Sequence, residues 1–256
     1  MIDKIVIIAA ALLLYSCADD EMNFSYELDP VLEARIADGN FKNVIRSGDL
    51  DIDTSKDGVI TIDEVHAYSG NLFLYSLGIA SLKGIELFSN VKSITCNFNA
   101  LKTIDVSENH SLLRLECAQN QLDELDVTNN LALKHLLCGQ NQLETLDLSR
   151  NDALFYVECH SNQLTNLSLG AYKMSALTCS DNKLTSLDLS PGFRLNSLYC
   201  ENNLLTSLDF SNNNRVTYLH AEGNPDLYCV KVKDETEQAI ATWKYDAHTS
   251  ISESCE

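Results

Sequence analysis

The chain has 256 residues, of which 45% are hydrophobic, and its 18 Lys and Arg against 37 Asp and Glu give a formal net charge of −19. This apolar content suffices for a core and excludes a disordered chain. The acidity argues against nucleic-acid binding, which needs clustered Lys and Arg, and against docking to anionic lipid through a basic patch. The nine Cys are an odd number, so they cannot all pair with one another.

The first residues have the pattern of a targeting signal. Ile5 to Leu14 is an unbroken apolar run of ten residues, whereas a membrane-spanning helix needs about 20. The segment Leu14-Tyr15-Ser16-Cys17 resembles the lipobox of bacterial lipoproteins. That resemblance implies a signal peptide over residues 1–16, cleavage after Ser16 and diacylation of Cys17. An ordinary secretory signal followed by a chance Cys is the alternative.

Residues 17–30 are predicted to form a tether, and they contain the acidic run Asp19-Asp20-Glu21. Directly after a lipidated Cys, such a run resembles the surface-export signal of some Gram-negative outer-membrane lipoproteins. The resemblance implies a protein that is lipid-anchored in the outer membrane and faces the cell exterior. The alternative is a solvated tether with no role in export.

Residues 53–64 match the twelve-position calcium loop of EF-hands, with Asp first, Gly at the sharp turn in position six and Glu last. The predicted metal ligands are Asp53, Ser55, Asp57, the Val59 carbonyl, Thr61 and Glu64. Helices over Asn40 to Arg46 and Thr61 to Tyr68 would flank the loop, and the sequence has no second loop to pair with it. We expect a small α-helical N-terminal cap over residues 31–70 that binds Ca²⁺ weakly. The alternative is an acidic turn that serves folding alone.

Residues 71–228 are repetitive, because six Cys follow one another at steps of 21, 21, 21, 20 and 21 residues, each with an apolar residue two positions before it and an Asn three positions after it. These are Cys96, Cys117, Cys138, Cys159, Cys179 and Cys200. One unit reads Leu112-x-x-Leu115-x-Cys117-x-x-Asn120-x-Leu122, which resembles the leucine-rich repeat. The expected fold is therefore a leucine-rich-repeat solenoid. It has a parallel β-sheet on the concave side, and each half-unit is too short for a long helix on the convex side.

The Cys column allows two interpretations, a metal or redox site and a column of small buried hydrophobes. Catalytic Cys needs an exposed, electropositive setting, whereas these side chains face a Leu-lined interior. Neighbouring thiols in a parallel ladder also have unsuitable Cβ geometry for a disulfide. We expect buried thiols, and we expect each repeat Asn to point inward and satisfy the backbone of a tight turn.

Residues 229–256 are predicted to form a disulfide-closed C-terminal cap. Cys229 and Cys255 are the only Cys outside the ladder besides Cys17, so one disulfide, one lipidated Cys and six buried thiols include all nine. A short helix is expected over Asp234 to Trp243. The order of signal, EF-like loop, an internalin-like unit with a short helix over residues 82–91, and Cys repeats resembles the surface leucine-rich-repeat lipoproteins of Gram-negative bacteria.

The residues that alternate with Leu and Cys on each repeat strand face outward, so the concave sheet carries columns of exposed side chains. Tyr is enriched in interface cores, and several Tyr stand in these columns. The predicted ligand-binding residues are Arg114, Glu116, His135, Leu137, Tyr156, Glu158, Tyr199, Tyr218 and His220. The sequence contains no HExxH, no Gly-rich phosphate loop and no local Ser-His-Asp arrangement, which predicts that the protein is not an enzyme.

We therefore predict a non-catalytic cell-surface binding or adhesion lipoprotein whose concave face binds a protein of the host or of the bacterial surface. A glycan-capture lipoprotein and a structural spacer of the cell surface are the alternatives. The acidic balance favours neutral or basic partners and not nucleic acid. Membrane contact is expected only through the lipid anchor, and the protein is expected to be a monomer.

Overall fold

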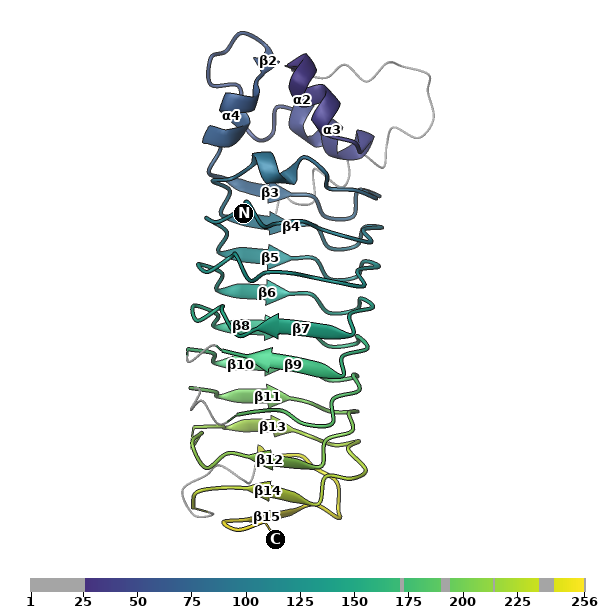
Figure 1. Ribbon diagram of the computed structural model, residues 1–256, viewed down its shortest axis with the longest axis vertical. Coiled ribbons are helices and arrows are strands. Elements are labelled where there is room, and N and C mark those ends of the chain that lie inside the picture. The colour runs from purple at the N-terminus through teal and green to yellow at the C-terminus, as the bar shows by residue number, and fades with distance from the viewer. Residues whose placement is uncertain (1–25, 171–172, 190–193, 214, 235–241, 256) are drawn as a thin grey trace.

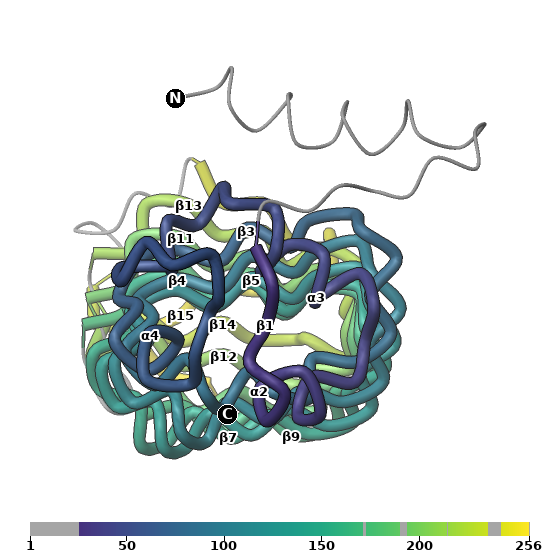
Figure 2. The backbone as a smooth tube through the Cα atoms, turned by 90° about the horizontal axis from the view of Figure 1, so that it is seen from above, coloured from purple at the N-terminus to yellow at the C-terminus, as the bar shows by residue number. Residues whose placement is uncertain are grey.

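The computed structural model describes residues 26–170, 173–189, 194–213, 215–234 and 242–255. The chain is a solenoid whose turns stack along one axis, with the helical cap at one end and the C-terminus at the other (Figure 1). Viewed along that axis, the turns lie over one another around a common interior (Figure 2). None of the described helices is long and apolar enough to cross a membrane. The predicted signal peptide and Cys17 lie outside the described residues.

The N-terminal cap consists of short helices that begin at side-chain caps. Its elements are β1 (Glu27–Leu28), α2 (Pro30–Arg35), α3 (Gly39–Arg46), β2 (Val59–Ile60) and α4 (Ile62–Ala67). Asp29 and Asp38 accept hydrogen bonds from the first backbone N–H groups of α2 and α3. Thr61 and Glu64 form a capping box at the start of α4. The helices α3 and α4 flank the acidic loop where the sequence predicts them.

The cap also includes residues that the sequence assigned to the tether. Strand β1 pairs in parallel with β2, because the Glu27 N–H donates to the Gly58 carbonyl and the Asp29 N–H donates to the Ile60 carbonyl, both at 2.9 Å. The backbone of the acidic loop therefore has a partner strand, although the sequence has no second calcium loop. The folded cap begins at about Glu27, before the predicted boundary at residue 31.

The main sheet runs the length of the solenoid. Among the described residues it has eight parallel strands in chain order: β3 (Asn71–Phe73), β4 (Ser93–Thr95), β5 (Arg114–Glu116), β6 (His135–Leu137), β8 (Tyr156–Glu158), β10 (Ala176–Thr178), β11 (Ser197–Tyr199) and β13 (Tyr218–His220). The central residue of each strand is buried and its two neighbours are at least partly exposed. Equivalent residues of successive repeats stand side by side, as Arg114, His135 and Tyr156 do. The predicted register is therefore confirmed.

The opposite wall is made of turns and short strands that run the other way (Figure 1). Strand β7 (Thr145–Leu148) pairs with β9 (Asn166–Leu169), and β12 (Ser207–Asp209), β14 (Cys229–Lys231) and β15 (Ser250–Ser252) form a second small sheet. A 3-10 turn, η1 (Ile85–Leu87), lies in the predicted internalin-like unit. The described part of this wall has no long helix, as expected from the short half-units.

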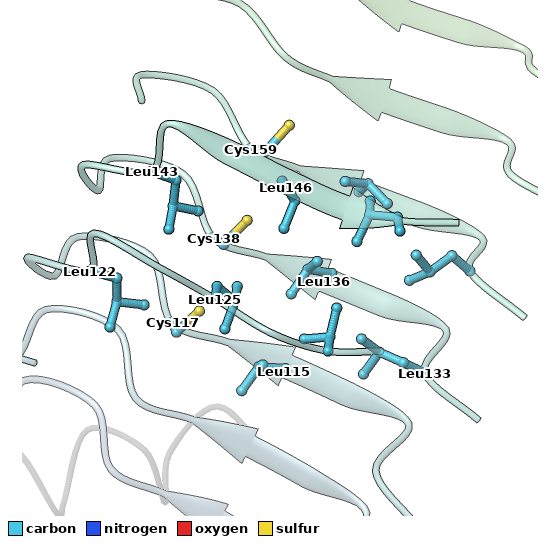
Figure 3. Packing of buried hydrophobic residues seen from close by; sticks show 14 of the residues in the cluster. Leu115, Cys117, Leu122, Leu125, Leu133, Leu136, Cys138, Leu143, Leu146 and Cys159 are labelled. Carbon is cyan, nitrogen blue, oxygen red and sulfur yellow. The ribbon is translucent and has the colours of Figure 1, made fainter. Parts of the chain in front are cut away.

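The interior is filled from both walls (Figure 3). Leu115 and Cys117 come from the main sheet, Leu122 and Leu125 come from the opposite wall, and all four are buried. All six ladder Cys are free and buried. Burial raises the pKa of the Cys117 and Cys179 thiols to about 12 and raises the pKa of the other four still further above the ordinary range. The prediction of a buried ladder is confirmed, and protonated thiols are poor nucleophiles.

The repeat Asn residues tie each turn to the one before it, as predicted. The Asn141 side-chain NH₂ donates to the carbonyls of Cys138 and Cys117, both at 3.0 Å. Its Oδ1 accepts from the Leu122 N–H at 3.0 Å. Six further Asn repeat this arrangement, with some variation at the two ends: Asn99, Asn120, Asn162, Asn182, Asn203 and Asn224.

The C-terminal end continues the stack before it closes. Strands β14 and β15, and a bridge between His220 and Lys244, extend both walls past residue 228. The predicted disulfide is present, since Cys229 and Cys255 are bonded across 26 residues of sequence. Buried Trp243 packs against Phe210 with 5.4 Å between the ring centroids. Residues 235–241, which make up most of the predicted helix, lie outside the described residues.

Candidate binding face

The outer face of the eight-stranded sheet, called the sheet face below, carries all nine predicted ligand-binding residues. Strand register places them in two columns: Arg114, His135, Tyr156 and Tyr218 in one, and Glu116, Leu137, Glu158, Tyr199 and His220 in the other. Each is partly or largely exposed. Their backbones are fixed by the sheet and by the buried Leu and Cys between them, so the face is pre-organised.

Neighbouring predicted residues contact one another in pairs. Arg114 forms a salt bridge with Glu116, and the Tyr156 hydroxyl donates to the Glu158 carboxylate. That hydrogen bond, together with partial burial, raises the pKa of Tyr156 to about 12. Partial burial, and then the positive charge of Arg114, lowers the pKa of His135. At neutral pH the face therefore presents a neutral Tyr156 and favours a neutral His135.

The C-terminal half of the sheet face is indented by a hollow of about 630 Å³. Its walls come from β8 and β11 and the turns after them, and its floor comes from the small residues of the intervening β10 turn. The lining residues are Tyr156, Glu158, His160, Thr178, Ser180, Asp181, Tyr199, Glu201 and Asn202. Three of the predicted residues meet here: Tyr156, Glu158 and Tyr199. His160 and Glu201 each follow a ladder Cys directly and therefore stand at outward-facing positions, but alternation along a strand does not indicate a cavity around them.

The hollow is acidic. Glu201 accepts hydrogen bonds from the Ser180 hydroxyl, and its carboxylate lies 3.2 Å from Nδ1 of His220. The Asn202 amide donates to Asp181 at 2.8 Å. Within the described part of the chain, no Lys or Arg forms a salt bridge with Glu158, Asp181 or Glu201. Three carboxylates therefore face the hollow with neutral hydroxyl and amide partners, and His220 is the one titratable base paired with them.

Exposed aromatic side chains that the sequence did not single out lie along the same face. The exposed fractions of Phe73, Tyr75 and Phe98 are 42%, 43% and 45%, and the Tyr75 and Phe98 ring centroids are 5.0 Å apart. Phe155 is 51% exposed, and its ring lies 6.4 Å from that of His135. Phe98 also has a left-handed backbone with φ of 59°, at a position where the other repeats carry Gln, Ser, Asp, Asn or Gly. An aromatic residue at this otherwise non-aromatic turn position is the sequence feature from which the exposed Phe98 could have been predicted.

One group on this face has the composition of a metal site. Glu201, His220 and Glu222 each offer a ligand atom, and these atoms lie within 4.8 Å of one another. It is the one such set of three His, Cys, Asp or Glu residues in the described chain. Tyr199 packs edge-on against His220, with 4.9 Å between the ring centroids. The group adjoins the hollow through Glu201, so tests of the hollow have to control for metal ions.

The acidic loop of the N-terminal cap has an oxygen-only donor set, which suits Ca²⁺. Gly58, with φ of 86°, makes the sharp turn and donates its N–H to buried Asp53 at 2.9 Å. Both oxygens of buried Glu64 already accept hydrogen bonds, from Thr54 and Ser55 on one side and from Thr61 on the other. The N–H groups of Ser55 and Thr61 lower the pKa of Glu64 to about 2. The oxygen donors fit Ca²⁺. A bound ion would replace some of the hydrogen bonds that the Glu64 carboxylate accepts.

The sequence matches no family model and no curated protein. Its structure is similar to internalin C2 of Listeria monocytogenes, with a TM-score of 0.64, 15% identity, and coverage of 89% of this chain and 100% of that chain. It is similar to internalin InlF of L. monocytogenes, with a TM-score of 0.57, 17% identity, and coverage of 87% and 73%. The leucine-rich effector protein YopM of Yersinia pestis gives a TM-score of 0.62, 21% identity, and coverage of 86% and 58%.

These similarities, together with the repeat register and the two walls, establish the class of fold. The chain is a leucine-rich-repeat solenoid, as its sequence predicts. At 15–21% identity these similarities define the fold alone. The function has to be inferred from the residues of the sheet face.

Proposed function

We propose that this protein is a non-catalytic cell-surface lipoprotein that binds a protein partner through the sheet face. The observation that carries the proposal is the exposure of aromatic side chains on a rigid parallel sheet. Phe73, Phe98 and Tyr218 are each more than 40% exposed on one continuous face. Aromatic side chains supply much of the binding energy in protein interfaces, and pre-organised positions lower the entropy cost of using them.

A partner can be mapped by truncating three Tyr of the sheet face. Proteins from host and bacterial extracts would be captured, and their affinities measured for Tyr156→Ala, Tyr199→Ala and Tyr218→Ala. Each change is expected to weaken binding by about 1–3 kcal/mol. Lys102→Ala and Arg150→Ala, at exposed positions on the opposite wall, are the controls and are expected to have almost no effect. Equal losses from both walls, or none from the Tyr set, would contradict the assignment.

Glycan capture is a second candidate, because two Tyr flank an open hollow that contains carboxylates and hydroxyls. A glycan array separates it from protein binding. Saturable glycan binding that Tyr156→Ala abolishes, without any captured protein, would favour the second candidate.

The anchoring proposal rests on residues outside the described ones and on the resemblance to surface lipoproteins. Lipidation of Cys17 would hold the protein in the outer membrane, and the acidic run behind it supports an orientation toward the exterior. Cys17→Ala should leave the protein unprocessed or release it from the membrane fraction. Intact-mass data that show an unmodified Cys17 in the membrane fraction would refute lipidation.

We propose separately that the loop over residues 53–64 binds Ca²⁺. A single extracellular loop should bind at the weak end of the known range, on the order of 0.1–1 mM. Asp53→Ala combined with Glu64→Gln should abolish the binding heat seen by calorimetry. Because buried Asp53 also accepts the N–H groups of Lys56 and Gly58, the double variant is expected to melt at a lower temperature even without Ca²⁺. No binding heat and no Ca²⁺-dependent change in melting temperature for the unaltered protein would show that the loop is structural only.

A further inference from the structure

We propose that the hollow of the sheet face binds a basic side chain of the partner, and that the chemistry of its lining fits arginine best. This inference rests on the proposed function, because the arginine comes from a partner protein.

The shape of the hollow follows from the order of the strands. β8, β10 and β11 are neighbours, so Tyr156 and Tyr199 lie two strands apart and two residues out of register, which places their backbones about 12 Å apart at the usual strand spacing and rise. Between them the β10 turn contributes only small side chains, Thr178 and Ser180, to the floor. A long, thin side chain can enter such a space and lie against a Tyr ring on either wall. Cations are attracted to aromatic faces within about 6 Å of the ring centroid.

The charge of the hollow points to the sign of its ligand. Glu158, Asp181 and Glu201 line it, and their hydrogen-bond donors are the Tyr156 and Ser180 hydroxyls, the Asn202 amide and the His220 ring. An ionised carboxylate has about four acceptor sites, so each of the three keeps capacity for a charged donor. The net charge of −19 adds a long-range attraction for basic ligands.

Arginine suits this lining better than lysine does. Its planar guanidinium carries five N–H donors, pairs with carboxylates through two parallel hydrogen bonds, and stacks on aromatic rings. The hollow offers both features together, Tyr rings on two walls and carboxylates beside them. Lysine has the same charge, but its ammonium group is compact and strongly hydrated, and it gains less from contact with an aromatic ring.

The probes for the test are N-acetyl-arginine amide and its uncharged isostere, N-acetyl-citrulline amide. Binding of each to the full chain would be followed by ligand-observed NMR with EDTA present, so that no metal at Glu201, His220 and Glu222 bridges the probe. The arginine probe should bind saturably, and the citrulline probe should bind at least about tenfold more weakly, since it keeps the shape and loses the charge.

Variants locate the binding site. Glu158→Gln combined with Glu201→Gln should weaken the arginine probe by about tenfold or more. Asp123→Asn combined with Glu124→Gln removes the same charge from exposed positions of the opposite wall and should leave binding within about twofold, because exposed distant charges are screened. Thr178→Leu fills the floor without changing charge and should also block the probe. Circular dichroism and melting curves check that each variant is folded.

Equal binding of the two probes, equal losses from the hollow and control pairs, or unaltered binding to a folded Thr178→Leu variant would each overturn the inference. The result is separable from the proposed function. If Tyr variants weaken a captured partner while the arginine probe does not bind, the inference fails and the proposed function stands. If the arginine probe binds in the hollow while no captured partner depends on the sheet face, the proposed function fails.

Discussion

The interior contains two columns of buried Asn side chains, one behind each wall. We predict that they contribute differently to the free energy of unfolding. Asn141 belongs to the column behind the main sheet and Asn130 belongs to the column of the opposite wall, and both side chains are buried. We consider Asn141→Ala and Asn130→Ala as a matched pair. Each removes the same atoms and leaves a similar cavity, so the difference between them reports hydrogen bonding.

The hydrogen bonds set the size of that difference. Asn141 is the hydrogen-bond partner of the buried Leu122 N–H, which the Ala variant leaves without one. An unsatisfied buried donor costs about 1–3 kcal/mol, and this term dominates, because the carbonyls of Cys117 and Cys138 keep the hydrogen bonds from Asn120 and Asn162. We therefore expect Asn141→Ala to lower the free energy of unfolding by about 3 kcal/mol.

Asn130→Ala should cost much less. The Asn130 NH₂ donates to the carbonyls of Val106 and Asn109, but these carbonyls also accept from the Asn109 and Leu112 N–H groups and keep those bonds. In the described structure the buried Oδ1 of Asn130 has no hydrogen-bond partner, so the substitution also removes an unsatisfied acceptor. The expected loss is about 1 kcal/mol.

Urea unfolding followed by circular dichroism measures both free energies of unfolding. If the dependence of that free energy on urea concentration is the same for both variants, a difference between their transition midpoints reports a difference in stability. Equal losses for the two variants, or a larger loss for Asn130→Ala, would refute the hydrogen-bond reasoning.

Three further outcomes follow from the structure. Because burial raises the thiol pKa values of the Cys ladder, alkylation of the native protein should be slow. Unfolding without reductant should expose six reactive ladder thiols, whereas eight reactive thiols would show that the disulfide is absent. Replacing both Cys229 and Cys255 by Ser should lower stability by about 3–4 kcal/mol in the chain-entropy model, measured by thermal or urea unfolding, and no change would contradict it. Because the Tyr156 hydroxyl donates to Glu158, Glu158→Ala should lower the Tyr156 pKa from about 12 toward 10, which NMR titration of the Tyr156 ring would detect; an unchanged pKa would exclude that bond as the cause.

The sequence predicted the solenoid because its signal is periodic. The positions of Leu115, Cys117 and Asn120 carry an apolar residue, a Cys and an Asn in six units, and each position has one structural role that the structure bears out. The pairing of residues 27–28 with residues 59–60 escaped prediction, because two isolated residues on each side carry no period. Such a pairing depends on how the helices of the cap pack, and not on the local pattern.

The hollow escaped prediction for a different reason. The columns of the sheet face follow from the repeat, but a cavity depends on the relative sizes of side chains on three adjacent turns. Thr178 is short, whereas its register neighbours Glu158 and Tyr199 on the adjacent strands are long. Asp181 and Asn202 join the lining from the turns after the strands, where the alternation of inward and outward side chains no longer applies.

The strands of the main sheet follow one another in chain order, so the solenoid can be lengthened or shortened by whole repeats. Each strand pairs only with the strands of the preceding and following turns, and no connection crosses between distant turns. The lining of the hollow lies between residues 156 and 202, whereas the two turns that begin at Cys96 and Cys117 lie closer to the cap. Excising the 21 residues from 118 to 138 would join equivalent points of two repeats and preserve every neighbouring contact type. The distance between the N-terminal cap and the hollow can therefore change by whole repeats while the hollow itself stays the same.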